Sequence, residues 1–405
     1  MSNATGSYGP IRLPATGLMV LGAIVFALTP SPQAKTTDVS RPTGRIPPTV
    51  GARREEQARR SPEEVPAMAF KVVATPFGRR TETDFPYEHE ALKPLGVTIQ
   101  TVSAESDDDY VAQVKDADAI IAGGRMLSAG IIGRLEKTKV IASGGVGVDR
   151  IDVDAATGKG IVVTNVPDVL TEEVAVHAFM LLLNCAKKTI PLDRCVREGR
   201  WGDARRYMSP MPRVVGDTLG LVAFGNIPRL VARKAKGFDM KVLAWDPFVA
   251  PEVFAEHGVE RVEDLIELFR RSDFVSAHLP LNRETRGLLD YECFGAMKPT
   301  AYFINTGRGP THNEADLIRA LQEQKLAGAG LDVMEKEPTD PDNPLHAIEN
   351  VVLTPHSASV SDRSNVERRR RIGQEIAAVL QGRMPKSVVN RDVLQKVSLA
   401  EPVRA

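Results

Sequence analysis

Six apolar runs follow one another between Leu219 and His356, and helix-length segments or loops separate them. Strands that are buried on both faces of a parallel sheet read as nearly continuous apolar runs. Because parallel neighbours must be joined by crossovers, usually helices, this count and spacing predict a doubly wound α/β domain of the nucleotide-binding type. The runs are TLGLVAF, KVLAWD, FVSAHLPL, AYFINTG, AGAGLDV and NVVLTPH.

A second α/β series precedes the first one in the chain. Short β-rich runs alternate with helix-length segments from Met68 to Asp168, which predicts a parallel sheet there as well. From Thr171 to Gly199 a long apolar stripe, opened by a Thr-x-Glu pattern like a capping box, predicts one long helix or two. An amphipathic helix is predicted over 365–382, and the tail RMPKSVVNRDVL after it is placed to return to the first domain.

The first 67 residues differ from the rest of the chain. They are rich in Pro, Ser, Thr, Gly and Arg, a composition typical of a disordered segment. The apolar run at 17–28 is too short to span a bilayer comfortably, and TPSPQAK after it is a poor signal-peptide cleavage site. We therefore expect a disordered leader, or translation from Met68, and a signal peptide is the alternative.

Charge and cysteine content limit the classes of partner. The chain has 52 Lys and Arg residues and 52 Asp and Glu residues, so its net charge does not attract nucleic acid or an anionic membrane. Cys185, Cys195 and Cys293 form no Cys-x-x-Cys pair, which favours inert thiols in a reducing compartment over disulfides or a metal site. We expect a cytoplasmic protein without nucleic-acid, membrane or metal partners.

The stretch GLVAFGNIPRLV joins the first of the six strands to the helix after it, and it resembles a degenerate dinucleotide-binding turn. Gly225 keeps the glycine that lets the backbone approach a pyrophosphate. The N–H groups of Asn226 and Ile227 can face the phosphates at the helix N-terminus. Ala223 can replace the first glycine if its φ is negative. Pro228 falls in the first helical turn, where a missing N–H costs no hydrogen bond.

Asp246 ends the second of the six strands. A carboxylate there can accept hydrogen bonds from both ribose hydroxyls of a dinucleotide and repels a 2′-phosphate. Neither Arg nor Lys follows it directly in AWDPF, so NAD is favoured over NADP. Taken alone, the turn also fits a purely structural strand–helix connection. The motifs further along the chain decide whether it is interpreted as a dinucleotide site.

Three further motifs each follow a predicted strand, at the strand ends where open α/β sheets hold their ligands. They are INTGRGP (304–310), GAGLDVMEKEP (328–338) and VVLTPHSAS (351–359). In this order and spacing they resemble the signature of the D-isomer-specific 2-hydroxyacid dehydrogenases, and the resemblance extends from about Met68 to Leu394. Within that family, the chain is most similar to the branch of the C-terminal-binding-protein corepressors and their bacterial enzyme relatives. Four segments carry this closer match, namely DFPYEHEAL, NVPDVLTEEVAVHA, DRCVREGRW and GRMPKSVVN.

The resemblance implies roles for three side chains. Arg308 matches the arginine that binds the substrate carboxylate and polarises the reacting carbonyl, which suits a planar guanidinium with paired donors. His356 matches the catalytic acid/base, and Glu337 matches the glutamate that pairs with it. A carboxylate beside an imidazole favours the protonated ring and fixes its orientation. Glu335 lies two residues earlier, but only Glu337 precedes the proline of the family motif.

The resemblance also implies how cofactor and substrate are held. Asp332 matches the aspartate that orients the nicotinamide carboxamide. The loop ASGGVGVD at 142–149 matches the loop whose backbone N–H groups hold the substrate carboxylate, near Gly145 and Val146. The expected cofactor contacts beside Asp332 are Gly225, Asn226, Ile227, Asp246, Pro280, Thr285, Thr306, Gly307, Arg308 and His356.

Together these features predict an α/β fold with two Rossmann-like domains, each a doubly wound parallel sheet. The substrate domain, residues 68–168 and 359–394, is expected to be discontinuous, because the NAD-binding domain, residues 169–358, is inserted into it; residues 1–67 belong to neither. The resemblance implies an NAD-dependent oxidoreductase that transfers a hydride between nicotinamide and a small 2-oxo or 2-hydroxy acid, of the glyoxylate/hydroxypyruvate reductase or phosphoglycerate dehydrogenase type. It also implies a homodimer formed through the helices after Thr171.

Two other functions stay open at this level. In a corepressor-like binding module, NAD occupancy would control partner binding and catalysis would be incidental, although the complete Arg-Glu-His set argues against it. In a pseudoenzyme, the changes at Ala223 and Pro228 would have abolished cofactor binding.

The chain departs from the family pattern at three positions, which bear on the size and charge of the substrate more than on the reaction. Ser143 stands where the substrate loop often has an arginine, and Arg150 stands where asparagine is common. His312 replaces a usual apolar residue and is expected to be a packing or surface variant. His177, inside the predicted long helix, is expected to be a structural histidine.

Overall fold

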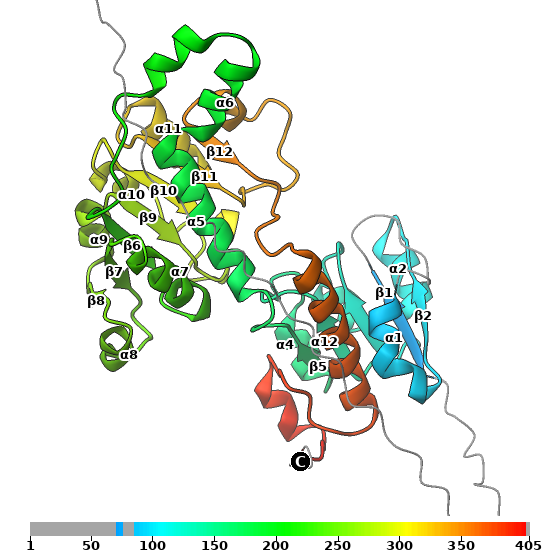
Figure 1. Ribbon diagram of the computed structural model, residues 1–405. Coiled ribbons are helices and arrows are strands. Elements are labelled where there is room, and N and C mark those ends of the chain that lie inside the picture. Colours follow the sequence, from blue (N-terminus) through cyan, green and yellow to red (C-terminus); the bar gives the residue numbers. More distant parts are fainter. Residues whose placement is uncertain (1–69, 76–84, 402–405) are drawn as a thin grey trace, which may run out of the picture. The chain divides into compact units, whose positions relative to one another are not determined.

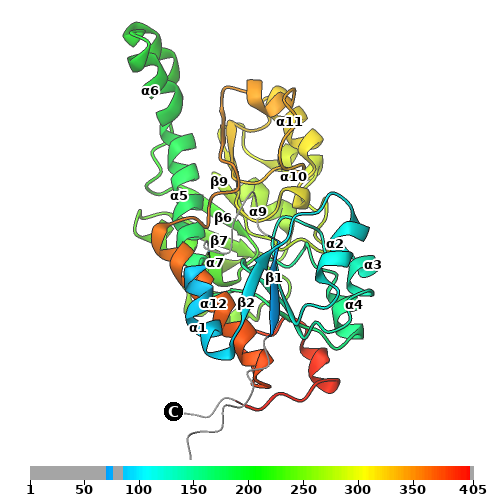
Figure 2. The ribbon, with the colours of Figure 1, turned by 90° about the vertical axis from the view of Figure 1, so that its right-hand side faces the viewer.

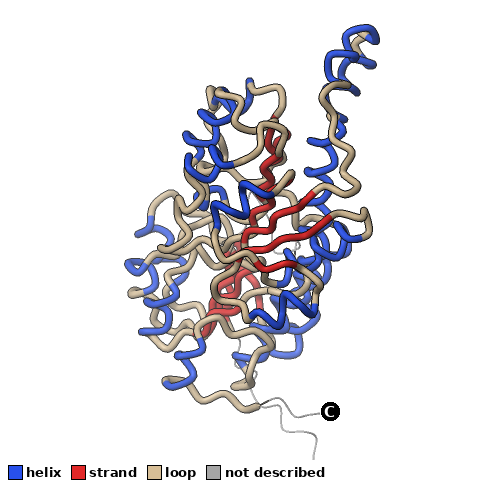
Figure 3. Tube along the Cα trace, turned by 90° about the vertical axis from the view of Figure 1, so that its left-hand side faces the viewer, coloured by secondary structure: helices blue, strands red, loops and turns tan. Residues whose placement is uncertain are grey.

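Parallel strands form two sheets in the part of the chain that the structure describes, residues 70–75 and 85–401 (Figure 1). The structure is a computed structural model. The predictions for the leader 1–67 fall outside the described residues. Figure 3 shows the strands in red with helices in blue on both sides of them, as expected for doubly wound sheets.

Within the described residues, the first sheet has five strands in the order β2-β1-β3-β4-β5. Chain order reverses between β1 and β3, and such a switch point leaves a crevice for a ligand at the carboxyl ends of the strands. The strands are β1 (Lys71–Ala74), β2 (Thr98–Thr101), β3 (Ala119–Ala122), β4 (Val140–Ser143) and β5 (Val162–Thr164). The helices between them are α1 (Pro86–Leu92), η2 (Lys93–Leu95), α2 (Asp107–Val114), α3 (Ala129–Ile132) and α4 (Val153–Gly158).

The end of the described chain returns to this first sheet. Helix α12 (Asp362–Leu380) packs against α1 and β4. A largely buried ion pair of 2.7 Å between Arg369 Nε and Glu88 Oε1 ties α12 to α1. Beyond α12, near η6 (Arg391–Gln395), Asn390 Oδ1 accepts the Val163 backbone N–H at 2.8 Å. The first domain is therefore discontinuous, as the tail sequence predicts.

The second sheet has seven strands in the described residues, in the order β12-β11-β10-β9-β6-β7-β8, with a switch point between β6 and β9. The six predicted runs form β6 (Thr218–Val222), β7 (Lys241–Trp245), β9 (Phe274–Ala277), β10 (Tyr302–Asn305), β11 (Gly328–Leu331) and β12 (Val351–Leu353). The edge strand β8 (Glu260–Arg261) was not predicted, because two charged residues leave no apolar run. The helices and 3₁₀ turns of this part are α7 (Asn226–Lys236), α8 (Pro251–Glu256), α9 (Leu265–Arg271), α10 (Tyr291–Ala296), η4 (Gly309–Thr311), α11 (Glu314–Gln322) and η5 (Pro344–Ala347).

The long apolar stripe forms two helices, α5 (Thr171–Lys187) and α6 (Thr189–Arg197), followed by η3 (Trp201–Tyr207). Lys188 separates α5 from α6 with a left-handed φ of 50°. The capping box expected at Thr171 is wrong, because Leu170 is the N-cap residue and makes no side-chain cap hydrogen bond. Figure 2 shows α6 at the end of an arm that extends beyond the second sheet.

The fold class is as the sequence predicts, an α/β chain with two doubly wound sheets and one domain inserted into the other. We propose that the domains divide near residues 168 and 358, before α5 and after β12. No helix in the described part of the chain combines the length and the apolar character needed to cross a membrane. The three cysteines are buried and free, and burial raises the pKa of Cys185 to about 12, which makes that thiol inert.

Candidate active site

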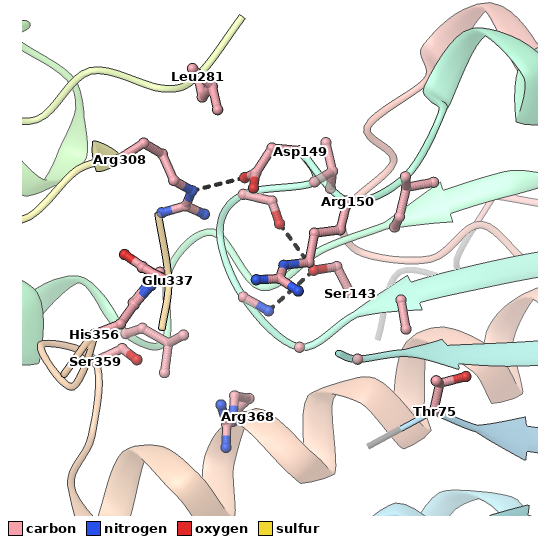
Figure 4. A pocket seen from close by; sticks show the side chains of 18 of the residues that line it. Thr75, Ser143, Asp149, Arg150, Leu281, Arg308, Glu337, His356, Ser359 and Arg368 are labelled. Atoms are coloured by element: carbon pink, nitrogen blue, oxygen red, sulfur yellow. Dashed lines mark hydrogen bonds and ion pairs between the residues drawn. The ribbon is translucent and has the colours of Figure 1, made fainter. Parts of the chain in front are cut away.

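A cavity of about 860 Å³ lies where loops from the two sheets meet (Figure 4). The ends of β1 and β3, at the switch point of the first sheet, and the loop after β4 form one wall. The loops after β10, β11 and β12 form another. Four predicted site residues from distant parts of the sequence line this one cavity, namely Gly145, Arg308, Glu337 and His356.

His356 and Glu337 form the pair that the sequence predicts. The His356 Nδ1 atom lies 2.7 Å from Glu337 Oε2, and the Met334 backbone N–H donates to Glu337 Oε1 at 3.1 Å. A carboxylate that is bound on one side by the backbone and on the other by the ring fixes the orientation of the imidazole. Nε2 is then the ring nitrogen that can reach a ligand, and the His356 side chain is 45% exposed.

The backbone that carries His356 adopts a constrained turn. His356 has a left-handed φ of 52°, which is uncommon for a residue other than glycine. The Asp332 carboxylate holds this turn, because it accepts a hydrogen bond from the Thr354 hydroxyl at 2.6 Å. It also accepts the backbone N–H groups of Ser357 and Ala358, both at 2.9 Å. Conformations of this kind persist only where the surroundings fix them, and they cluster at functional sites.

Asp332 is completely buried and does not line the cavity. Burial works against its ionisation, but hydrogen bonds from His177, Thr354 and the loop amides outweigh burial and lower the pKa of Asp332. His177 Nε2 lies 2.9 Å from Thr354 Oγ1, so this histidine is structural, as expected, and supports the His356 turn. No motif around His177 indicates this support. The contact of Asp332 with a nicotinamide carboxamide stays a prediction.

Arg308 follows β10 and reaches across the cavity to the loop after β4. Its Nε donates to Asp149 Oδ1 at 2.8 Å, and Nη1 donates to the Gly307 carbonyl at 2.8 Å. Burial opposes the ionisation of Asp149, but the charge and hydrogen bond of Arg308 prevail and lower the pKa of Asp149. The guanidinium lies directly over Gly147, where a Cβ would come 1.9 Å from Nη2. Glycine at position 147 is therefore required for this contact.

Ser143 stabilises the loop that is expected to bind a substrate carboxylate. Its hydroxyl donates to the Gly147 carbonyl at 3.1 Å and accepts the Gly145 N–H at 3.3 Å. Val146 is 37% exposed and does not line the cavity, while its carbonyl accepts the Asn165 amide. Of the two predicted substrate residues in this loop, only Gly145 lies in the cavity wall. Ser143, which stands where the family often has an arginine, thus stabilises the conformation of the loop through these two hydrogen bonds.

A buried polar cluster supports the Arg308 loop from behind. Asn305 accepts the Gly307 N–H at 2.9 Å and donates to the Arg308 carbonyl at 3.2 Å. Its Nδ2 also lies 3.0 Å from His312 Nδ1. His312 is 1% exposed, and its Nε2 has no hydrogen-bond partner within the described residues. Of the two alternatives for His312, packing is therefore correct, and burial lowers the pKa of His312 to about 4.

Acid is expected to destabilise the protein through His312. The residue titrates near pH 6.5 when unfolded and near 4 when folded, so the unfolded chain binds the extra proton first. The contribution of neutral His312 to the free energy of unfolding is complete above pH 6.5 and is lost as the pH falls toward 4. About 2 kcal/mol of it is lost at pH 5. Denaturant unfolding at pH 7 and pH 5 measures this loss. His312→Val, which also removes a buried nitrogen without a partner, should lose less, whereas the exposed control His346→Val should follow the wild type. Equal losses in wild type and His312→Val would contradict the assignment.

The dinucleotide turn has the geometry of a ligand site. β6 ends at Val222 and α7 begins at Asn226. Gly225 is exposed, and a Cβ built on it would meet no described atom within 4 Å, so the N-terminus of α7 faces open space. Asp246 follows the neighbouring strand β7, and its Oδ2 accepts the Phe224 N–H at 2.9 Å. Backbone N–H groups beside a carboxylate at a switch point fit the phosphates and ribose of a dinucleotide.

Ala223 adopts a φ of 77°, so the condition under which alanine could replace the first glycine, a negative φ, is not met. Its N–H donates to the Trp245 carbonyl at 2.9 Å, and this hydrogen bond ties the turn to β7. A side chain in the left-handed region costs about 1–2 kcal/mol compared with the glycine of the usual pattern. Pro228 is buried at the third position of α7, in the first turn, as predicted.

Ala223→Gly is expected to raise the free energy of unfolding by about 0.5–1 kcal/mol. The relief of backbone strain exceeds the entropy that glycine adds to the unfolded chain. Thermal unfolding should show a midpoint about 2 °C higher. Ala255→Gly is the control, because Ala255 is exposed inside α8, where glycine lowers the free energy of unfolding by about 0.5–1 kcal/mol. A lower midpoint for Ala223→Gly would refute the strain.

The remaining predicted cofactor residues lie in the loops after β9 and β10. The Thr285 hydroxyl donates to the Pro280 carbonyl at 2.6 Å and closes the first loop. Thr306 is buried, and its Oγ1 lies 3.3 Å from His278 Nδ1. Burial lowers the pKa of His278 to about 3, so this histidine stays neutral. Sequence reasoning missed His278, although a histidine directly after an apolar strand, in FVSAHLPL, was a usable signal.

Comparisons with known proteins agree with this geometry. The family model described as D-isomer specific 2-hydroxyacid dehydrogenase, NAD binding domain, matches residues 179–358. The chain is 42% identical over 287 residues to a glyoxylate reductase of Korarchaeum cryptofilum, and the match covers 70% of this chain and 86% of that protein. It is 35% identical over 308 residues to a D-3-phosphoglycerate dehydrogenase of Methanocaldococcus jannaschii, covering 75% of this chain and 58% of that protein.

A solved structure extends the likeness to the fold. The NADPH-dependent glyoxylate/hydroxypyruvate reductase of Sinorhizobium meliloti, in complex with NADP and malonate, superposes with a TM-score of 0.69 and 29% identity, covering 80% of this chain and 97% of the other. Sequence identity at this level over most of a relative, together with the same two-domain fold, indicates common descent. The chain therefore belongs to the D-isomer-specific 2-hydroxyacid dehydrogenase family.

Proposed function

We propose that the protein is an NAD-dependent oxidoreductase that interconverts a small 2-oxo acid and the corresponding D-2-hydroxy acid. One observation carries the proposal, namely that Arg308 and the hydrogen-bonded pair of His356 and Glu337 line the same cavity. Each side chain alone is unremarkable in a protein of this size. Together they supply a carboxylate-binding cation, a proton carrier and the group that orients it.

Arg308 and the loop after β4 would hold the substrate in one orientation. The guanidinium is fixed by Asp149 and by the Gly307 carbonyl, and it lies at the cavity wall. A substrate carboxylate would take its Nη donors in paired hydrogen bonds, next to the backbone at Gly145. A cation that is already oriented needs little reorganisation when the substrate binds, which favours the productive geometry.

His356 would carry the proton that the substrate oxygen gains or loses. Its Nε2 is the exchanging atom, because Nδ1 is engaged by Glu337 Oε2. The glutamate holds the ring in the orientation in which Nε2 can donate a proton during reduction and accept one during oxidation. The bound nicotinamide supplies or accepts the hydride at its C4 atom.

The turn between β6 and α7, together with Asp246, supports NAD as the cofactor. A carboxylate at the end of β7 would repel the 2′-phosphate of NADP, and like-charge contacts of this kind cost enough to weaken binding about 10-fold or more. Calorimetry should therefore show NADH binding and much weaker NADPH binding. Absence of NADH binding at millimolar concentration would favour the pseudoenzyme instead.

Turnover is tested by following NADH absorbance with glyoxylate, hydroxypyruvate, pyruvate and 3-phosphohydroxypyruvate. The proposed enzyme consumes NADH with at least one of these acids, and the ranking identifies the substrate. If NADH binds but none of the acids is reduced, and no D-2-hydroxy acid is oxidised with NAD, the enzyme proposal fails and the NAD-sensing binding module replaces it.

We also propose that the chain forms a homodimer through the arm of α6 and η3. Val196 and Trp201 on this arm are 51% and 75% exposed. Exposure of apolar surface to water is unfavourable, and a partner subunit that covers these side chains would remove it. Light scattering should give twice the 44.0 kDa chain mass for the wild type. Val196→Glu with Trp201→Glu should give monomers, while Met126→Glu, at another exposed apolar position (52%), should not. A wild type of single-chain mass would refute the dimer.

A cytoplasmic location is part of the proposal. The buried free cysteines support it, since a reducing compartment keeps thiols in that state. Fractionation of cells that make the protein should recover it with cytoplasmic markers, and recovery outside the cytoplasm would contradict the proposal.

A further inference from the structure

The loop after β4, which is proposed to hold the substrate carboxylate, is anchored from behind by a residue outside the cavity wall. Asn165 directly follows β5, and its Nδ2 donates to the Val146 carbonyl at 2.6 Å. We propose that Asn165 is a positioning residue, which orients the backbone N–H groups of Val146 and Gly147 for the carboxylate of the substrate. The inference rests on the proposed function and adds to it a residue that acts through the loop without contacting the substrate.

The carbonyls of this loop face the chain segment after β5. The Gly145 carbonyl accepts the Val166 N–H at 2.9 Å, and the Val146 carbonyl accepts the Asn165 amide. In a planar trans peptide, an N–H points opposite to the carbonyl of the preceding residue. The N–H groups of Val146 and Gly147 therefore both point away from Asn165, and neither has a hydrogen-bond partner among the described residues. Successive N–H groups arranged in this way can bind an anion.

Arg308 brings another donor to the same part of the loop. Gly147 lies in the cavity wall, and a Cβ built on it would come 1.9 Å from Arg308 Nη2. Figure 4 shows Arg308 reaching across to this loop at Asp149. Asp149 and the Gly307 carbonyl take Nε and Nη1, which leaves Nη2 for a ligand. A carboxylate bound to Nη2 would lie beside the Gly147 backbone, so the orientation of the Gly147 N–H decides whether it adds a hydrogen bond.

The Asn165 side chain is itself fixed by the chain segment after α12. The Ser387 hydroxyl donates to Asn165 Oδ1 at 2.6 Å. Because a carbonyl can only accept, the Val146 carbonyl requires the amide nitrogen, and the amide oxygen is left for Ser387. Ser387 is held in turn by the buried Glu375 of α12, whose Oε2 accepts the N–H groups of Lys386 at 2.8 Å and of Ser387 at 3.4 Å. The segment that returns to the first sheet thus supports the substrate loop through Asn165.

The test measures whether Asn165 acts on carboxylate binding in the complete protein. In Asn165→Ala the Val146 carbonyl loses its donor, and the Gly147 N–H is no longer held toward the cavity. We expect kcat/KM for the best acid of the panel to fall by about 10- to 100-fold, mainly through KM, which is the value of a hydrogen bond to a charged group. Oxamate is a non-reacting analogue of glyoxylate with the same carboxylate. Its Kd for the NADH complex, measured by calorimetry, should rise by the same factor, while the Kd of NADH stays as in the wild type.

Two further variants make the result specific. Asn350→Ala is the matched control, because Asn350 Nδ2 donates to the Ala327 carbonyl at the same distance of 2.6 Å and neither residue lines the cavity. Its kcat/KM and its Kd for oxamate should stay as in the wild type. Ser387→Ala leaves Asn165 its bond to Val146 but removes the hydroxyl that fixes the amide. Its kcat/KM should fall by about 2- to 10-fold, the value of a neutral hydrogen bond.

These measurements separate a positioning role from a merely structural one. A residue that only stabilises the fold would lower the midpoint of thermal unfolding and leave the Kd of oxamate unchanged. If that is the result for Asn165→Ala, or if the Kd of NADH rises as much as the Kd of oxamate, the inference is wrong and the proposed function stands. If Asn165→Ala does not fold, Ser387→Ala decides, and a wild-type Kd for oxamate in that variant overturns the inference. If the wild type reduces no acid, the proposed function fails and the inference fails with it.

Discussion

Replacing His356 by alanine is expected to lower kcat by about 10²- to 10⁴-fold while NADH affinity changes little. The loss follows from the removal of Nε2, the atom that exchanges the proton, and general acid–base catalysis contributes about this much. NADH affinity should persist, because the N-terminus of α7 and Asp246, which would hold the dinucleotide, belong to other loops. The rate is read from NADH absorbance with the best acid of the panel, and the affinity from calorimetry.

Glu337→Gln separates orientation from proton transfer. The amide can still accept the Met334 N–H and contact the His356 ring, but it no longer offsets the charge of a protonated ring. We expect a smaller loss of kcat than for His356→Ala. His346→Ala is the matched control, since His346 is exposed in η5 away from the cavity wall and should behave as wild type. Wild-type activity in His356→Ala would remove His356 from the mechanism.

The features that depend on local patterns could be predicted from the sequence. Six apolar runs indicated six strands of the second sheet, because buried parallel strands need apolar residues on both faces. The motifs around Arg308, Glu337 and His356 each follow one of these apolar runs, so they could be placed at strand ends. The fold brings all three side chains to one cavity. The edge strand β8 could not be predicted, since its stability comes from pairing with β7 and not from its own two residues.

The features that depend on tertiary contacts could not be predicted. Nothing in the sequence near Arg308 indicates that its Nε binds Asp149, or that the close contact requires glycine at position 147. Likewise, the His356 turn is held by three hydrogen bonds to the Asp332 carboxylate, and that arrangement exists only after folding. Ala223 is the opposite case, because the local rule that disfavours alanine at positive φ is overridden by a turn that the surrounding strands impose.

The fixed orientation of the Arg308 guanidinium, and not its charge alone, determines how variants at this position are expected to behave. The guanidinium uses Nε for Asp149 and Nη1 for the Gly307 carbonyl, so its plane is set before a substrate arrives. Arg308→Lys keeps the charge, but a single ammonium cannot hold Asp149 and a substrate carboxylate in that plane. We expect kcat/KM to fall by about 10²-fold, and by about 10³-fold or more in Arg308→Gln, where the charge is also lost.

Steady-state kinetics with the best acid checks these values, and the split between the constants shows where the effect lies. Loss of carboxylate binding alone would raise KM, whereas loss of the polarised carbonyl would lower kcat as well, and we expect both. Arg319→Gln is the matched control, because Arg319 lies exposed on α11 and pairs with Glu323 outside the cavity. Asp149→Asn should lose less than Arg308→Lys, since the asparagine can still accept a hydrogen bond from Nε. If Arg308→Lys retains the wild-type kcat/KM, charge alone suffices at this position and the fixed plane of the guanidinium contributes nothing to catalysis.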